Sequence, residues 1–103
     1  MRANGGAALF EPADGGVALV KGPLTFGSVG PLLAAGRDAI AAGRAGSIDL
    51  AGVDGADSAG LALLIEWLSI ARQAGREIRY RNLPAQIIQL ARLSEVEELL
   101  PTG

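Results

Sequence analysis

The fold of this chain is decided by the stretch Val53-Asp54-Gly55-Ala56-Asp57-Ser58-Ala59-Gly60-Leu61-Ala62-Leu63-Leu64. It follows a short apolar run at residues 47–51 and leads directly into residues at helical spacing, so it predicts a strand, a tight loop and a helix. The first turn of a helix exposes unpaired backbone N–H groups and the positive end of the helix dipole. The hydroxyl of Ser58 can therefore cap the helix, carry a phosphate or lie at the centre of a docking surface.

Length and composition limit the functions open to the chain. Its 103 residues predict a single domain over residues 1–103, with an aliphatic core because aromatic residues make up only 4%. A net charge of −2 argues against a nucleic-acid-binding protein with a broad basic surface. Without Cys or His, the chain has no disulfides and no thiolate or imidazole catalysis, and neither a metal site nor a cofactor is expected.

The sequence predicts a soluble, cytoplasmic protein. Its longest hydrophobic run, residues 61–65, is far shorter than the roughly 20 residues that span a bilayer. Residues 1–8 lack the apolar segment of a signal peptide. The absence of Cys fits the reducing cytosol. No direct insertion into a membrane is expected.

The pattern along the chain predicts an α/β fold. Apolar runs at residues 8–10 and 17–20 flank a turn-rich stretch and predict a β-hairpin, whose second strand ends at Pro23. Helical spacing follows, with Ser28 as a possible cap and Gly36 interrupting the pattern. The predicted helices are residues 28–44, 58–74, 84–93 and 95–100, and the two further strands are residues 47–51 and 77–80. The order ββαβαβαα predicts a mixed four-stranded sheet with an N-terminal hairpin and about four helices.

The helix at residues 58–74 carries two apolar stripes on nearly opposite sides. The first stripe is expected to pack on the sheet and consists of Leu61, Leu64, Ile65, Leu68 and Ala71. The second consists of Leu63, Trp67, Ile70 and Ala74. Two interpretations remain open: a neighbouring helix such as that at residues 84–93 covers the second stripe, or the stripe is a partner surface anchored by Trp67.

The side chains that could carry chemistry are few. Asp57 and Ser58 can act simply as a helix cap. Asp49, Asp54 and Asp57 lack the spacing of a calcium loop and are interpreted as separate turn carboxylates. Residues 52–60 lack the Gly-Lys-Ser/Thr ending of a phosphate loop, and no nucleophile–base pair is evident. An enzyme is therefore not expected. The remaining charged cluster, Arg76, Arg79 and Arg81, is interpreted as a solvated edge.

Residues 48–61, with Asp57-Ser58-Ala59-Gly60-Leu61 at their end, resemble the STAS domain of sulfate transporters and anti-sigma-factor antagonists. The order of elements fits that family, as does Leu24-Thr25-Phe26 before the first predicted helix. Residues 60–67, 81–86 and 93–101, which include Asn82-Leu83-Pro84, are most similar to one branch of it. That branch is the small MlaB-like STAS subunit of the Mla-type phospholipid ABC transporter.

The resemblance implies a non-catalytic subunit that binds the MlaF-like ATPase of the transporter, in complex with a permease. It implies a peripheral location at the cytoplasmic face of the inner membrane and a role in moving phospholipid between the two membranes of a Gram-negative cell, which underlies lipid asymmetry. The contact is expected around the start of the helix that begins at Ser58. The predicted partner-binding residues are Asp57, Ser58, Ala59, Gly60, Leu63 and Trp67.

An alternative function comes from the other branch of the family. In anti-sigma factor antagonists, a partner kinase phosphorylates a hydroxyl in the matching loop, and Ser58 stands at that position here. Position 59 is Ala, where many phosphorylated antagonists carry a second Ser or Thr. That departure weakens the case for phosphoregulation and leaves docking untouched.

Overall fold

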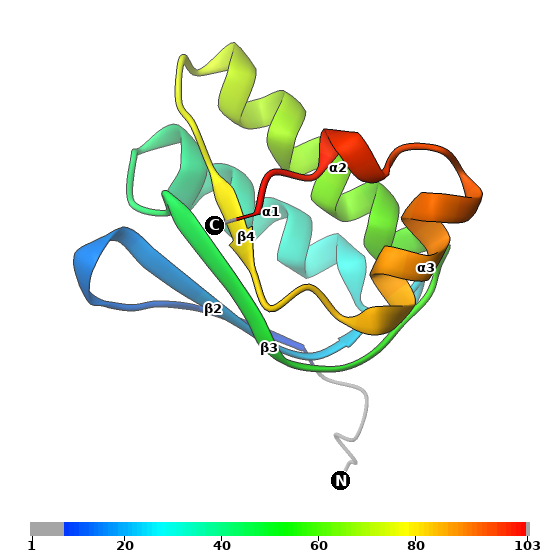
Figure 1. Ribbon diagram of the computed structural model, residues 1–103. Helices are drawn as coiled ribbons and strands as arrows, with labels where there is room; N and C mark the ends of the chain where they lie inside the picture. Colours follow the sequence, from blue (N-terminus) through cyan, green and yellow to red (C-terminus); the bar gives the residue numbers. More distant parts are fainter. Residues whose placement is uncertain (1–7, 103) are drawn as a thin grey trace, which may run out of the picture.

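The computed structural model describes residues 8–102 and contains a four-stranded sheet of order β1-β2-β3-β4 (Figure 1). Its elements are β1 (Leu9–Pro12), η2 (Asp14–Gly16), β2 (Val17–Leu24), α1 (Val29–Ala41), β3 (Ser47–Ala56), α2 (Ser58–Gln73), β4 (Arg79–Arg81), α3 (Ala85–Leu93) and η3 (Glu97–Leu99). β1 pairs antiparallel with β2, whereas β2–β3 and β3–β4 are parallel. The predicted α/β fold with a mixed sheet is confirmed. No helix among residues 8–102 is long and apolar enough to cross a membrane.

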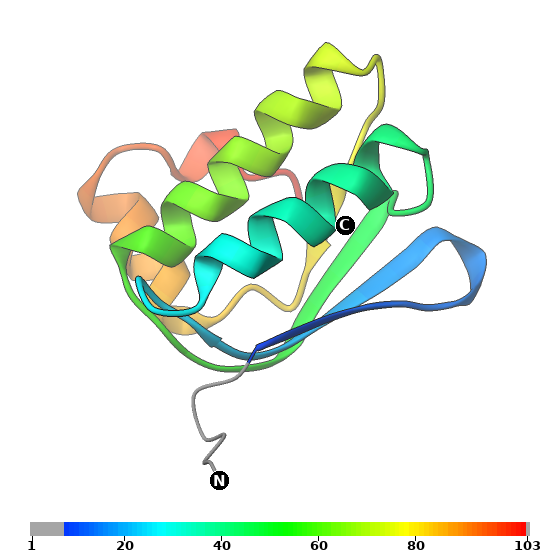
Figure 2. The ribbon, with the colours of Figure 1, turned by 180° about the vertical axis from the view of Figure 1, so that it is seen from behind.

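α1 and α2 lie side by side over one face of the sheet (Figure 2). Alternate residues of β2 and β3 point into this layer, and Ala18, Val20, Ile48 and Leu50 are all buried there in one hydrophobic cluster. The intervening Leu19 of β2 is only partly buried. This alternation is the strand signal expected for a sheet that is covered on one face.

Strands β2 and β3 run further than the sequence pattern predicts. β3 does not end at residue 51, because Gly52, Val53 and Ala56 continue the parallel pairing with β2. β2 likewise does not end at Pro23, where a shift of register between Gly22 and Pro23 lets the ladder continue to Leu24. The predicted tight loop before α2 is therefore reduced to a single residue, Asp57, between Ala56 and Ser58.

The C-terminal segment differs from the prediction of a fourth helix at residues 95–100. Glu95 adopts a left-handed backbone conformation with φ 59°, which stops the helical path after α3, and only the 3-10 turn η3 follows. Beyond it the chain returns to the sheet, where the Tyr80 N–H donates to the Pro101 carbonyl oxygen at 2.8 Å. Tyr80 and Thr102 also form a parallel bridge, so the tail covers the outer edge of β4.

Leu63 and Trp67 of the second apolar stripe are internal, which corrects the expectation that they lie on a partner surface, whereas Ala74 at the end of the stripe is exposed. Trp67 is 0% exposed and Leu63 is 4% exposed. A Cβ at Gly36 of α1 would overlap the indole of Trp67, so α1 comes close to α2 only because position 36 has no side chain. Phe10 of β1 meets the same indole edge-on, with ring centroids 5.6 Å apart. The covering helix is thus α1 and not the helix at residues 84–93.

Candidate functional site

The start of α2 lies at the end of the molecule where β2 and β3 finish and where α1 also begins (Figures 1 and 2). The Asp57 N–H donates to the Leu24 carbonyl oxygen at 3.1 Å, which joins the ends of the two strands. Gly60 is buried against the same carbonyl, from which a Cβ at position 60 would be 2.5 Å away. Gly60, predicted as a partner-binding residue, therefore lets the first turn of α2 sit directly on the end of β2.

Asp57 is the residue that caps α2. Its Oδ1 accepts hydrogen bonds from the backbone N–H groups of Ala59 at 2.9 Å and Gly60 at 3.4 Å. Its Oδ2 accepts from the backbone N–H of Phe26 at 3.1 Å. One carboxylate thus caps the helix and fastens the turn between β2 and α1. Of the roles open to the Ser58 hydroxyl, that of the cap is wrong, because Asp57 Oδ1 accepts from both capped N–H groups.

Ser58 is the first residue of α2 and is exposed to solvent. Its hydroxyl makes no hydrogen bond to any residue in the part of the chain that the structure describes, so it is free to meet another molecule. Ala59 beside it is half-buried. The helix dipole favours an anion at this position, whereas the neighbouring carboxylate of Asp57 opposes one. The site can present a hydroxyl to a partner, and no basic group among residues 8–102 accepts a hydrogen bond from it, as a general base activating that hydroxyl would.

The turn beside Asp57 is not among the predicted site residues. Ser28, expected to cap α1, instead turns its hydroxyl back into the turn, where it donates to the Pro23 carbonyl oxygen at 2.7 Å and accepts from the Thr25 N–H at 2.9 Å. The backbone N–H groups of Ser28 and Val29 both donate to the Thr25 carbonyl oxygen. This turn holds Phe26 outward with its side chain 85% exposed. An aromatic residue inside a turn, next to Gly27, was the signal that could have drawn attention to it.

The remaining acidic residues do not join Asp57. Asp49 Oδ1 accepts from the Asn82 amide and from the Ala51 backbone N–H, each at 2.9 Å. These hydrogen bonds, the one from Asn82 first, hold the pKa of Asp49 below its ordinary value, with a smaller contribution from Arg81. Among the described residues, no group of three His, Cys, Asp or Glu side chains gathers as metal ligands would.

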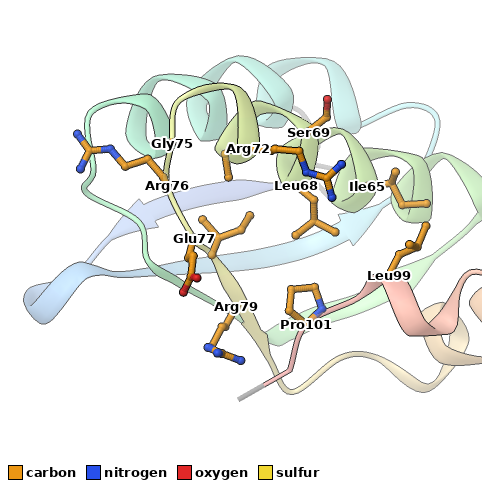
Figure 3. A pocket seen from close by; sticks show the side chains of 12 residues that line it. Ile65, Leu68, Ser69, Arg72, Gly75, Arg76, Glu77, Arg79, Leu99 and Pro101 are labelled. Carbon is orange, nitrogen blue, oxygen red and sulfur yellow. The ribbon is translucent and has the colours of Figure 1, made fainter.

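An open groove of about 620 Å³ lies elsewhere on the molecule, between α2 and the C-terminal segment (Figure 3). Its lining residues are Ile65, Leu68, Ser69, Ala71, Arg72, Gly75, Arg76, Glu77, Ile78, Arg79, Leu99 and Pro101. At a rise of 1.5 Å per residue, Arg72 lies about 21 Å along α2 from Ser58. Arg76 and Arg79, predicted as part of a basic cluster, contribute to this groove, whose polar lining has no paired carboxylates. The groove and the start of α2 are therefore separate features.

A comparison with family models identifies the chain. The model described as "Mlab, STAS domain" matches residues 10–101, which include helices α1, α2 and α3 and the candidate site at Asp57 and Ser58. This chain belongs to the MlaB-type STAS domain family. The family resemblance noted in residues 48–61 is thereby confirmed. A search of curated proteins by sequence gave no significant match.

Solved structures show how widely this fold of the MlaB-type STAS domain is shared. The anti-sigma factor antagonist SpoIIAA in its unphosphorylated form aligns with a TM-score of 0.64 and 16% identity, over 92% of this chain and 84% of that one. SpoIIAA of Bacillus in its phosphorylated form aligns with a TM-score of 0.66 and 15% identity, over 93% and 90%. SLC26A9 aligns with a TM-score of 0.52 and 16% identity, over 96% of this chain but 23% of that chain. At these identities the likeness shows the fold alone.

Proposed function

We propose that this MlaB-type STAS domain is a non-catalytic accessory subunit of a phospholipid ABC transporter and that it binds the transporter's ATPase subunit around Ser58. The observation that carries the proposal is the state of Ser58, which is exposed at the start of α2 with its hydroxyl unused by the described residues. A hydroxyl that neither caps the helix nor faces a base suits a contact surface better than a reaction centre. Membership of the MlaB-type family supports the choice of an ABC ATPase subunit as the partner.

The docking surface that we propose is smaller than the sequence predicts. Leu63 and Trp67 are buried inside the domain, so they are not part of the docking surface. Gly60 acts through the packing of α2 on β2. Asp57, Ser58 and Ala59 remain, together with exposed Ala62, one helical turn beyond Ser58. Because these side chains are small, a partner can approach the backbone of α2 closely. Binding there would hold the domain at the cytoplasmic face of the inner membrane.

The test is a titration of the purified domain against the ATPase subunit of the same cell's phospholipid transporter, with ATPase turnover measured alongside. We expect binding and a gain in activity or stability of the ATPase subunit, and no ATPase, phosphatase or lipase turnover by the domain alone. Turnover by the isolated domain, or no association with the ATPase subunit, would overturn the proposal.

The charge variant Ser58→Asp locates the surface. It should fold normally, since a carboxylate in the first turn suits the helix dipole, yet bind about tenfold more weakly because it adds like charge beside Asp57. Ser69→Asp is the matched control, because Ser69 is also an exposed serine of α2 but lies towards its other end. Equal dissociation constants for wild type and Ser58→Asp would place the interface elsewhere.

A second function, that of an anti-sigma factor antagonist, is favoured by one observation. The exposed hydroxyl of Ser58 at a helix start is open to a kinase, and the fold is shared with SpoIIAA, which has been solved with and without phosphate. Affinity purification from the native cell separates the two functions. Recovery of an ABC ATPase supports the transporter subunit, whereas a histidine-kinase-like ATPase and phosphate on Ser58 by mass spectrometry support the antagonist.

A further inference from the structure

Phe26 is the most exposed of the large hydrophobic side chains in residues 8–102, at 85%. The chain's other phenylalanine, Phe10, packs against Trp67 in the core. Exposed apolar residues occur singly on most proteins, so exposure alone does not indicate a function. Leu93 at the end of α3 is almost as exposed, at 82%, and serves as the comparison.

What distinguishes Phe26 is the way its backbone is held. Its N–H donates to Asp57 Oδ2 at 3.1 Å, across 31 residues of sequence. On either side, the hydroxyl of buried Ser28 bridges the Thr25 N–H and the Pro23 carbonyl oxygen. The aromatic side chain is thus displayed to solvent from a turn whose polar groups are used to keep it rigid. Such preorganisation of the backbone lowers the entropy lost when a loop is fixed at an interface.

Phe26 also belongs to the same rigid unit as Ser58. The carboxylate of Asp57 accepts from the Phe26 N–H with one oxygen and caps α2 with the other. Gly27, which follows Phe26, and Ser58, which follows Asp57, are both exposed and small. A partner surface that receives the exposed phenyl ring would have an apolar pocket for one aromatic side chain.

We propose that Phe26 is the apolar anchor of this domain in its complex with the ABC ATPase subunit, and that Asp57 is a positioning residue that holds Phe26 in place. The inference rests on the proposed function and adds to it the residue that fills a pocket of the partner. Phe26 contacts the partner directly, whereas Asp57 acts through the backbone of the turn.

The first test is a titration of the ATPase subunit with wild type, Phe26→Ala and the matched control Leu93→Ala. We expect Phe26→Ala to raise the dissociation constant about 30-fold or more, as loss of an interface hot spot does, and Leu93→Ala to leave it unchanged. Equal losses for the two variants, or none for Phe26→Ala, would overturn the role of Phe26. If the wild-type domain fails to bind the ATPase subunit, the proposed function itself fails. That result differs from the two outcomes that concern Phe26 alone.

The second test is Asp57→Asn, alone and combined with Phe26→Ala. An amide has one oxygen where the carboxylate has two, so it can keep the helix cap or the bond to Phe26 but not both. We expect a several-fold rise in the dissociation constant in the wild-type background and none in the Phe26→Ala background. An equal rise in both backgrounds would show that Asp57 acts independently of Phe26. Sedimentation of the free domain completes the test, since a dimer abolished by Phe26→Ala with ATPase binding intact would reassign Phe26 to self-association.

Discussion

Trp67 and Phe26 are two aromatic residues that lie in opposite environments. Trp67, on the apparently spare stripe of α2, is 0% exposed, whereas Phe26, in a turn before α1, is 85% exposed. The hydrophobic core includes residues from both apolar stripes of α2, and the exposed aromatic side chain lies on a loop. A second apolar stripe on a helix therefore indicates a second packing surface within the domain before it indicates a partner surface.

The difference has a local cause in each region. At Trp67, Gly36 of α1 leaves room for the indole, and Phe10 of β1 closes it from the side. In the sequence, Gly36 interrupts the helical pattern, but in the structure its lack of a side chain allows α1 and α2 to approach each other. At Phe26, the turn is shaped by the hydrogen bond that the Phe26 N–H donates to Asp57 and by the one that the Ser28 hydroxyl donates to the Pro23 carbonyl oxygen.

The largest effect that would test this comparison is expected for Trp67→Ala set against Phe26→Ala. Loss of the buried indole should lower the free energy of unfolding by about 3–5 kcal/mol, while Phe26→Ala should stay within about 0.5 kcal/mol of wild type. Urea unfolding followed by circular dichroism measures both. Trp67→Phe keeps a ring in the site and removes the indole N–H, which is buried without a partner among the described residues, so it should lose less.

A stable Trp67→Ala protein that fails to bind the ATPase subunit would reverse the comparison and restore Trp67 as a surface residue. Acrylamide quenching of the single tryptophan gives an independent check on the wild type. A buried indole should be poorly accessible to the quencher, and Phe26→Ala should not change that accessibility.

The next effect is smaller and is expected for Gly36→Ala. A Cβ at this position overlaps the indole of Trp67, so the helices must separate or the ring must move. Ala is the better helix former by roughly 1 kcal/mol, yet we expect a net loss of about 1–3 kcal/mol from the crowded core. Thermal unfolding with a red shift of Trp67 fluorescence checks this. Gly30→Ala is the control, because a Cβ at Gly30 in the first turn of the same helix meets no atom within 4 Å.

Periodicity and turn chemistry predict most of this fold. The hairpin, the strand at Ser47 and the helix from Ser58 are confirmed with nearly the expected starts, because each combines a clear apolar period with a turn or cap signal. The elements that differ depend on distant partners. β2 continues through Pro23 because β3 pairs beside it, and the expected last helix becomes η3 because the tail returns to β4. Neither pairing is visible in a local window of sequence.

The start of α2 lies where the sequence predicts it, but the residues around it have different roles from those expected. The sequence places an acidic residue and a hydroxyl before a helix, and both types cap well, so composition alone does not decide between Asp57 and Ser58. The geometry decides, because Asp57 lies just before α2 in extended backbone and reaches the Ala59 N–H. The contact with Phe26 spans 31 residues, so no spacing rule could have revealed it.

A smaller effect on stability distinguishes the capping residue Asp57 from its neighbour Ser58. Asp57→Ala removes the acceptor of two helix N–H groups and of the Phe26 N–H, so it should lower stability by about 1–2 kcal/mol. Ser58→Ala should change stability by less than about 0.5 kcal/mol, because its hydroxyl bonds to none of residues 8–102. Denaturant midpoints of the two variants measure this. A larger loss in Ser58→Ala than in Asp57→Ala would return the cap to Ser58.

The smallest effect is expected at Asp49, which is also a carboxylate bound to a backbone N–H but lies about 26 Å along extended strand β3 from Asp57. Because the folded state lowers the pKa of Asp49, its charged form stabilises the fold above the unfolded-state value near 3.9. That contribution is lost as the pH falls through the lower folded-state pKa.

Asp49→Asn should therefore lower the free energy of unfolding by less than about 1 kcal/mol at pH 7, and the gap in stability to wild type should close below about pH 4. Unfolding curves between pH 7 and pH 3 measure this gap, and a titration shows whether Asp49→Asn leaves ATPase binding unchanged. Weaker binding would extend the docking surface well beyond Phe26 and Asp57, and a gap that widened in acid would contradict the direction of the pKa shift.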